Sequence, residues 1–237
     1  LLAVVEGRSK QAFKSWLEAQ TKAFRDRVEI VAMDGFTGYK SAAVKAIDTV
    51  TTVMDPFHVV ALVGDKLDRC RQRVQQETLG HRGRSDDPLY GIRRVARTRA
   101  GLLTKKQQHR LAKVFADQRH VAFETTWSVY QDVIDAYQAD QPAEGKKIMT
   151  RLIDSLRTGV PTGLDELRTL GRTLNRPRDD ILAFFDHPGT SNGPTEAVNG
   201  LLEHLRGTAR GFRSIVNYVA RCLLDAGGFR PLIHSLL

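Results

Sequence analysis

Two apolar runs rich in β-branched residues, joined by one helical segment, constrain the fold of this chain most strongly. Residues 27–34 (RVEIVAMD) and 49–60 (TVTTVMDPFHVV) each contain such a run followed by an aspartate, a pattern typical of a buried strand. Apolar residues between 39 and 47 repeat at helical spacing, and Thr37 or Gly38 can begin that helix. Two strands joined by a helix of this length favour parallel pairing, so this part of the chain predicts an α/β fold.

The chain changes character after this unit, because residues 59–186 contain no convincing strand pattern. Apolar residues recur there every three or four positions, which is typical of amphipathic helices. A segment rich in Gly, Asp and Arg at 80–91 predicts a loop. Helices are predicted over residues 103–118, 125–139, 141–157, 164–174 and 178–185, and two more span about 194–205 and 214–225. We therefore expect the chain to be mostly α by residue count.

Positive charge is concentrated in one segment of the chain. The whole chain has a formal net charge of +9, and residues 69–119 hold 14 Lys and Arg against 4 Asp and Glu. This surplus favours a polyanionic partner, nucleic acid first. Solvated helix faces with no ligand are the alternative explanation.

Two absences limit the class of protein. No apolar run reaches about 18 residues, so we expect no membrane span. Cys70 and Cys222 are far apart and lack the spacing of a zinc site or a disulfide framework, which favours an intracellular, cytoplasmic protein.

Asp34 and Asp55 each follow a predicted strand. Ligands in open α/β sheets gather at the carboxyl ends of strands, so either side chain could project into a cleft. An aspartate at this position is also a good turn or helix-start residue, and both interpretations stay open.

Glu196 lies in the first turn of the helix predicted to begin at Pro194, within TSNGPTEAVNG. A glutamate at the third helical position can belong to a capping box, but that box requires Ser or Thr where this chain has Gly193. A charge–dipole interaction with the helix start remains, worth roughly 0.3–1 kcal/mol. Capping therefore does not account for Glu196.

The predicted helix has two distinct faces. A glycine inside it costs roughly 1 kcal/mol relative to alanine, and close approach of a ligand or backbone is one reason to retain it. The apolar face is expected to be buried and consists of Val198, Leu201, Leu202 and Leu205. The polar and small face, which we expect to make a contact, consists of Glu196, Asn199, Gly200 and Glu203.

Phosphoryl transfer on nucleic acid gives these features a common purpose. Two Mg²⁺ ions about 3.5–4 Å apart can stabilise the attacking and leaving oxygens of such a reaction. Mg²⁺ prefers hard oxygen ligands such as carboxylates from separate elements. Asp34 and Glu196 are ligands of this kind, and the basic segment would bind the polyanion with a strong salt dependence.

Three motifs resemble the ISL-three family of DDE insertion-sequence transposases: VAMDGFTGYKSAAV, TVMDPFHVV and TSNGPTEAVNGLLEHLRGTARGFRSIVNYVAR. The resemblance covers almost the whole chain, and the last motif is the most specific. It implies a ribonuclease H-like fold in which three acidic residues bind two divalent metal ions, Mg²⁺ or Mn²⁺. The family cuts DNA at transposon ends and joins the freed 3′-hydroxyl to a target, which implies DNA as partner and a homo-oligomer on DNA.

By position in the motifs, the resemblance assigns Asp34 as the second family carboxylate and Glu196 as the third. Asp55 and Asn199 are candidates to support these ligands, and Asp55 could equally be structural. The first carboxylate would precede Leu1, as would the family's zinc-binding and helix-turn-helix segments. We therefore interpret the chain as a fragment that binds DNA weakly and is nearly inactive alone.

The implied organisation is an incomplete ribonuclease H-like core with few strands and a large helical insertion. Residues 1–64 would begin the core, 65–185 would form the basic insertion, and 186–237 would complete the core. A non-catalytic helical DNA-binding module, or a degenerate transposase remnant, is the alternative.

Several further residues carry specific expectations. Arg206, Arg210 and Arg213 flank two glycines in a basic turn, an arrangement that suits phosphate contact. Trp127 is expected in the core, with an aromatic platform against DNA as the alternative. A packed helical face is likewise expected from Phe13, Trp16 and Leu17. His58 is expected to be packed rather than catalytic.

Overall fold

A computed structural model describes residues 3–227 except 8, 36 and 82, and it is mostly helical with a small parallel sheet. The strands are β1 (Ile30–Met33) and β2 (Thr51–Met54), and the short 3-10 helices are η1 (Ala100–Leu102) and η2 (Gln118–His120). The α-helices are α1 (Lys10–Glu18), α2 (Lys22–Asp26), α3 (Thr37–Ala46), α4 (Pro56–Leu79), α5 (Arg93–Ala96), α6 (Lys105–Phe115), α7 (Val121–Tyr137), α8 (Pro142–Thr158), α9 (Asp165–Asn175), α10 (Arg178–Asp186), α11 (Gly193–Thr208) and α12 (Ile215–Ala226). Packing divides the chain into two compact units, residues 1–52 with 191–237, and residues 53–190. The domain boundaries expected from the sequence stay a prediction.

The strand–helix–strand arrangement predicted near the start of the chain is present as β1, α3 and β2. β1 and β2 are neighbours in the sheet, and the N–H of Thr51 donates to the carbonyl of Glu29 at 2.8 Å. The mixed α/β character is confirmed, although each strand has only four residues. Among the described residues these two strands form the whole sheet, so a ribonuclease H-like core stays a proposal.

Helices α1 and α3 pack against each other beside this sheet. Leu17 of α1 is buried, as are Ala42, Ala43 and Ile47 on the α3 side. The ring of Phe13 meets that of Tyr39 edge-on, with centroids 5.5 Å apart. The α1 face expected to be packed is therefore at least half-buried.

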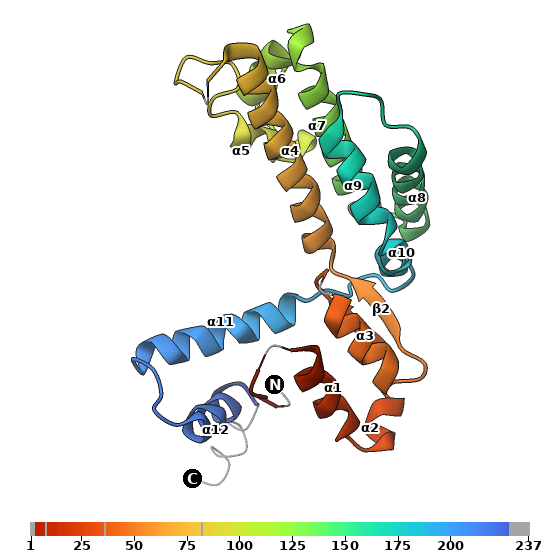
Figure 1. Cartoon of the computed structure of the whole chain (residues 1–237), viewed down its shortest axis with the longest axis vertical. Coiled ribbons are helices and arrows are strands. Elements are labelled where there is room, and N and C mark those ends of the chain that lie inside the picture. Colours follow the sequence, from red (N-terminus) through yellow and green to blue (C-terminus); the bar gives the residue numbers. More distant parts are fainter. Residues whose placement is uncertain (1–2, 8, 36, 82, 228–237) are drawn as a thin grey trace. The chain divides into compact units, whose positions relative to one another are not determined.

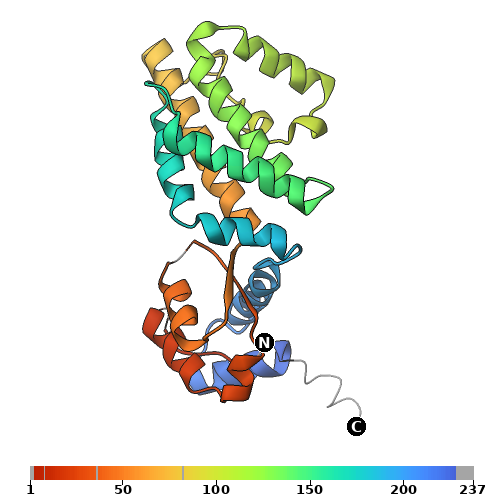
Figure 2. The same cartoon turned by 90° about the vertical axis from the view of Figure 1, so that its right-hand side faces the viewer.

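The second unit is a helical bundle around α4. Figures 1 and 2 both show α4 running the length of this unit, with α5 and α6 at one end and α10 at the other. α4 packs on α7 and α9, and α8 packs on α7 and α9. One continuous apolar core extends from Met54 to Phe185. Between residues 59 and 186 the described chain contains no strand, as predicted.

Two glycines let the bundle helices approach closely. A Cβ at Gly145 would lie closer than 3.0 Å to the carbonyl oxygen of Ala136, and a Cβ at Gly171 would lie equally close to that of Leu156. Real Cβ atoms essentially never come so close to a backbone oxygen, so these positions require glycine. Trp127 packs within the core against Phe115, with ring centroids 5.3 Å apart, in agreement with its expected core position.

Several arginines of this unit are paired with carboxylates. Arg73 of α4 donates two hydrogen bonds of 2.9 Å to Glu166 of α9. Asp68 accepts from Arg93 at 2.6 Å and lies 2.9 Å from Arg97, which fastens α5 to α4. These arginines serve the fold, because they hold helices together.

No helix in the described part of the chain combines the length and the apolar character needed to cross a membrane.

Candidate functional site

Asp34 lies at the carboxyl end of a strand, as the sequence predicted. It directly follows Met33, the last residue of β1, and precedes α3 by three positions. Met33 is buried, whereas Asp34, just past the end of the strand, is exposed. The carboxylate is therefore accessible at the edge from which a strand-end ligand would act.

Glu196 lies in α11, which begins at Gly193 and not at Pro194 as predicted. Asn192 is the N-cap residue, and its side chain makes no capping hydrogen bond. Glu196 is thus the fourth helical residue, one position beyond the glutamate of a capping box. Its backbone N–H donates to the carbonyl of Asn192 at 3.0 Å, and its side chain is exposed. The helix start accordingly gives Glu196 no capping role.

The apolar face of α11 is not buried, so that prediction is wrong. No described residue of α11 is buried, Leu201 is 42% exposed, and Leu202 and Leu205 are half-buried. The physical reason is that α11 packs mainly on the single helix α12, which cannot cover a full apolar stripe. A Cβ at Gly200 would meet no atom within 4 Å, so no part of the described chain approaches it.

A hollow of about 450 Å³ connects α11 with the other elements of the first unit. Asn199, one turn after Glu196, lines it together with Tyr39 from the first turn of α3. Phe13 and Trp16 of α1 form part of its wall. The unit therefore brings Asn199 of α11 and Tyr39 of α3 to one cavity, although about 160 positions separate them in the sequence.

The described residues contain no group of three or more His, Cys, Asp or Glu side chains that could hold a metal ion. Two carboxylates nevertheless fit Mg²⁺, which is commonly bound through one or two protein carboxylates together with water and substrate phosphates. Asp34 and Glu196 have the right donor chemistry and the exposure that a substrate phosphate requires. A closed metal cage of protein ligands does not fit the described residues.

Asp55 has a structural role in the second unit. It is buried, with 5% of its surface exposed, and its carboxylate accepts a hydrogen bond of 2.9 Å from the N–H of Phe57. This bond and Pro56 begin α4, since Asp is a good N-cap and Pro suits the first turn. Burial, together with the charge of Asp55, raises the pKa of Tyr137. A role of Asp55 in supporting a metal site stays a prediction, and His58 is half-buried in the first turn of α4.

Three exposed arginines surround the end of α11. Arg206, Arg210 and Arg213 make no ion pair with a carboxylate in the described part of the chain. The N–H of Gly211 donates to the carbonyl of Arg206 at 2.9 Å, and the N–H of Arg210 donates to that of Gly207 at 3.0 Å. These two bonds form a Schellman motif, which places Arg210 at the position where helices usually have glycine.

Arg210 adopts a left-handed backbone conformation with φ of 52°. It is the one such non-glycine residue in the described chain. A left-handed conformation is unfavourable for a residue with a Cβ, and such outliers cluster at functional positions. The conformation of Arg210 therefore costs the fold some stability.

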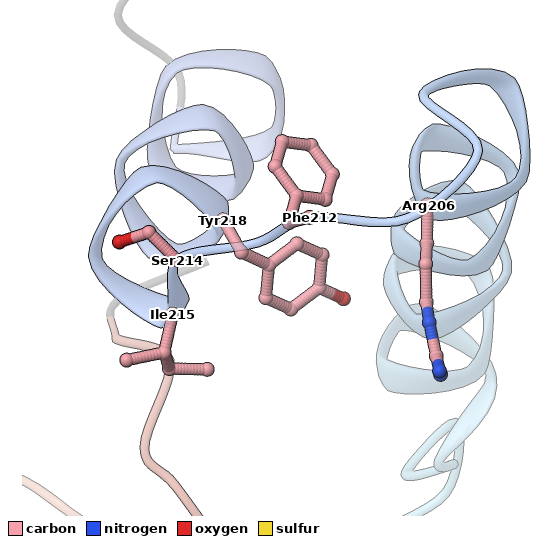
Figure 3. Close-up of a pocket in the computed structure, with 5 residues that line it drawn as sticks. All are labelled: Arg206, Phe212, Ser214, Ile215 and Tyr218. Carbon is pink, nitrogen blue, oxygen red and sulfur yellow. The ribbon is translucent and has the colours of Figure 1, made fainter.

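A shallow depression of about 310 Å³ lies beside these arginines. Arg206 lines it with Phe212 and Tyr218, and Figure 3 shows the Tyr218 hydroxyl pointing from α12 toward α11, along which the Arg206 side chain runs. The ring centroids of Phe212 and Tyr218 lie 5.1 Å apart, and partial burial, together with a hydrogen bond with Cys222, raises the pKa of Tyr218. Sequence reasoning missed Tyr218, because its neighbourhood depends on how α12 folds back onto the turn.

Comparison with known proteins adds one finding. A model of the ISL-three DDE family, described as transposase, matches residues 1–222. No curated protein and no solved structure matches the chain.

Proposed function

The chain belongs to the ISL-three family of DDE transposases, and from this membership we propose that it carries the metal-binding catalytic residues of a DNA transposase. The reaction is polynucleotidyl transfer. Water attacks a phosphodiester at the transposon end, and the bond to the 3′ oxygen breaks to leave a 3′-hydroxyl. That hydroxyl then attacks a target phosphodiester, forms the new bond and releases a target 3′-hydroxyl.

Asp34 and Glu196 are the proposed metal ligands. Bound Mg²⁺ or Mn²⁺, two ions in the family's site, would lower the pKa of the attacking water and stabilise charge on the phosphate oxygens. The chain contributes two exposed carboxylates from a strand end and a helix start. Because the two carboxylates belong to different elements, the fold sets the distance between them. Because both are exposed, DNA can reach them.

The observation that carries this proposal is the hollow that Tyr39 of α3 and Asn199 of α11 both line. Asp34 lies three positions before α3, and Glu196 lies one turn before Asn199, which lines that hollow. Both carboxylates belong to the same compact unit. This arrangement supports a ribonuclease H-like core in which they face a common ligand.

DNA is held by the basic turn between α11 and α12. Arg206, Arg210 and Arg213 are exposed, and arginine forks suit phosphate oxygens. The Tyr218 hydroxyl beside Arg206 adds a neutral donor. We place the protein in the bacterial cytoplasm at the nucleoid, where it acts as a homo-oligomer on transposon-end and target DNA.

The test compares single variants in the protein encoded by the whole gene. Asp34→Asn and Glu196→Gln should lower Mg²⁺-dependent strand cleavage by about 10³-fold or more, since losing a metal ligand removes several kcal/mol of transition-state stabilisation. Glu203→Gln is the matched control, because Glu203 is an exposed glutamate two turns further along α11. Cleavage that survives both ligand substitutions within tenfold would refute the assignment.

A non-catalytic DNA-binding module is the second candidate. The absence of a three-ligand cluster among the described residues favours it. It predicts DNA binding without any metal-dependent cleavage, and equal behaviour of Glu196→Gln and Glu203→Gln.

A further inference from the structure

A second basic surface lies on α6 in the helical unit. We define the α6 basic face as Lys106, Arg110 and Lys113, all of which are exposed. Positions four and three residues apart lie on one side of an α-helix, so these three cations form a single stripe of roughly 10 Å. Leu111 and Val114 are buried on the side of α6 that packs into the unit.

The charges of this face are not neutralised by carboxylates. α6 contains no Asp or Glu, and within the described residues no carboxylate pairs with any of the three cations. Arg110 donates only to a backbone carbonyl, that of Tyr90, at 2.9 Å. Arg93 of the neighbouring α5 is instead bonded to Asp68. Paired arginines fasten helices, whereas the α6 cations face solvent.

The placement of charge along α6 is also unfavourable for the isolated helix. Thr104 and Gln107 form a complete capping box, so the helix start is well defined. Lys105 and Lys106 occupy its first turn, where the helix dipole is positive and a carboxylate would be stabilising. Two lysines in the first turn of α6 cost stability, and no carboxylate of the described chain compensates for them. This combination points to an anion outside the chain as their partner.

We propose that the α6 basic face binds the phosphate backbone of duplex DNA without reading its sequence, which rests on the transposase function proposed above. Duplex DNA carries about one negative charge per 1.7 Å, so a 10 Å stretch offers phosphates to all three cations. Single-strand binding would require exposed aromatic rings for base stacking. Phe115, the one aromatic residue of α6, packs on Phe123 and Trp127 instead.

The experiment measures binding of the whole chain to a 30-base-pair duplex of random sequence by fluorescence anisotropy. EDTA is present throughout, and the salt concentration is varied from 50 to 200 mM. The test variant is Lys106→Gln, Arg110→Gln and Lys113→Gln combined. The matched control, Lys146→Gln, Lys147→Gln and Arg151→Gln, removes three cations that α8 pairs with Glu144 and Asp186.

The test variant should raise Kd at least tenfold at 100 mM salt and reduce the slope of log K against log salt by about 2–3, because each lost phosphate contact removes about 0.9. The control should change Kd by less than threefold. A charge-retaining variant, Lys106→Arg with Arg110→Lys and Lys113→Arg, should bind within threefold of the wild type. This rescue separates lost charge from lost folding.

Three results would overturn the proposal: unchanged binding by the test variant, equal loss in the α8 control, or tighter binding to duplex RNA than to duplex DNA. The outcome is independent of catalysis, because EDTA removes the metal. Failure of the metal site and failure of the α6 basic face are therefore distinguishable.

Discussion

Replacing Arg210 with glycine is expected to make the protein more stable and a weaker DNA binder. Arg210 occupies the left-handed position of the Schellman motif that ends α11, with φ of 52°. Both hydrogen bonds of that motif involve backbone atoms, so the substitution leaves them intact. What it removes is the steric conflict of the Cβ and one exposed positive charge.

The two effects have separate magnitudes. A left-handed conformation costs an L-residue roughly 1–2 kcal/mol, and the greater freedom of glycine in the unfolded chain offsets about 0.4–1 kcal/mol of the gain. The free energy of unfolding should therefore rise by about 0.5–1 kcal/mol. Loss of one phosphate contact should reduce the salt slope of DNA binding by about 0.9.

Arg210→Ala is the matched control, because it removes the same charge but retains the unfavourable conformation. It should weaken DNA binding as much as Arg210→Gly and leave stability within about 0.5 kcal/mol of the wild type. The chain has two tryptophans, and Trp16 alone lies in the first unit. Urea denaturation followed by Trp16 fluorescence in a Trp127→Phe background therefore reports on this unit. Equal stability of the glycine and alanine variants would refute the strain argument, and unchanged DNA binding by both would refute the phosphate contact.

Three further substitutions test the helical unit and helix α11. Burial would raise the pKa of Glu166, but the hydrogen bonds that Arg73 donates to this carboxylate outweigh burial and lower the pKa. The ionised carboxylate therefore stabilises the fold fully at pH values above 4.5, the usual pKa of the group. This contribution is lost as the pH falls through the lowered pKa of the folded protein. Denaturation at a series of pH values should show Glu166→Gln to be less stable at pH 7 by about 1.5–3 kcal/mol, with a shallower loss in acid, and a parallel pH profile would contradict this. Gly171→Ala should lower stability by about 1–3 kcal/mol or more, because its Cβ would meet the Leu156 carbonyl. Gly200→Ala, with no atom within 4 Å, should raise stability by up to about 1 kcal/mol, and thermal unfolding that ranks the two glycines in the opposite order would show the packing argument to be wrong.

The local pattern of residues was sufficient to predict much of the fold. Apolar periodicity gave the strand–helix–strand beginning and the helices that follow it, since these periods belong to the elements themselves. The run at 49–60 also contained the boundary between a strand and a helix, because Asp55 caps α4 and Pro56 cannot continue the hydrogen bonding of a strand. The strand accordingly ends at Met54, and the remaining apolar residues belong to a helix.

Features that depend on tertiary packing could not be predicted in this way. A stripe on α11 identifies the apolar side of a helix but not how much of it a partner covers, which is why its predicted burial was wrong. The left-handed conformation of Arg210 contradicts the preference for glycine there, and only the helix end in the structure reveals it. The neighbourhood of Arg206 and Tyr218 likewise requires α12 to fold back along α11.

Cleavage of the protein backbone by bound Fe²⁺ tests the central claim most directly, because it locates a divalent metal without requiring transposition. Fe²⁺ with ascorbate and peroxide generates hydroxyl radicals that cut the chain beside the ion. We predict cuts near both Asp34 and Glu196, suppressed by excess Mg²⁺, abolished at both positions by either Asp34→Asn or Glu196→Gln, and unaffected by Glu203→Gln. Cuts at only one of these positions, or cuts near Glu196 that persist in Asp34→Asn, would contradict a shared metal site.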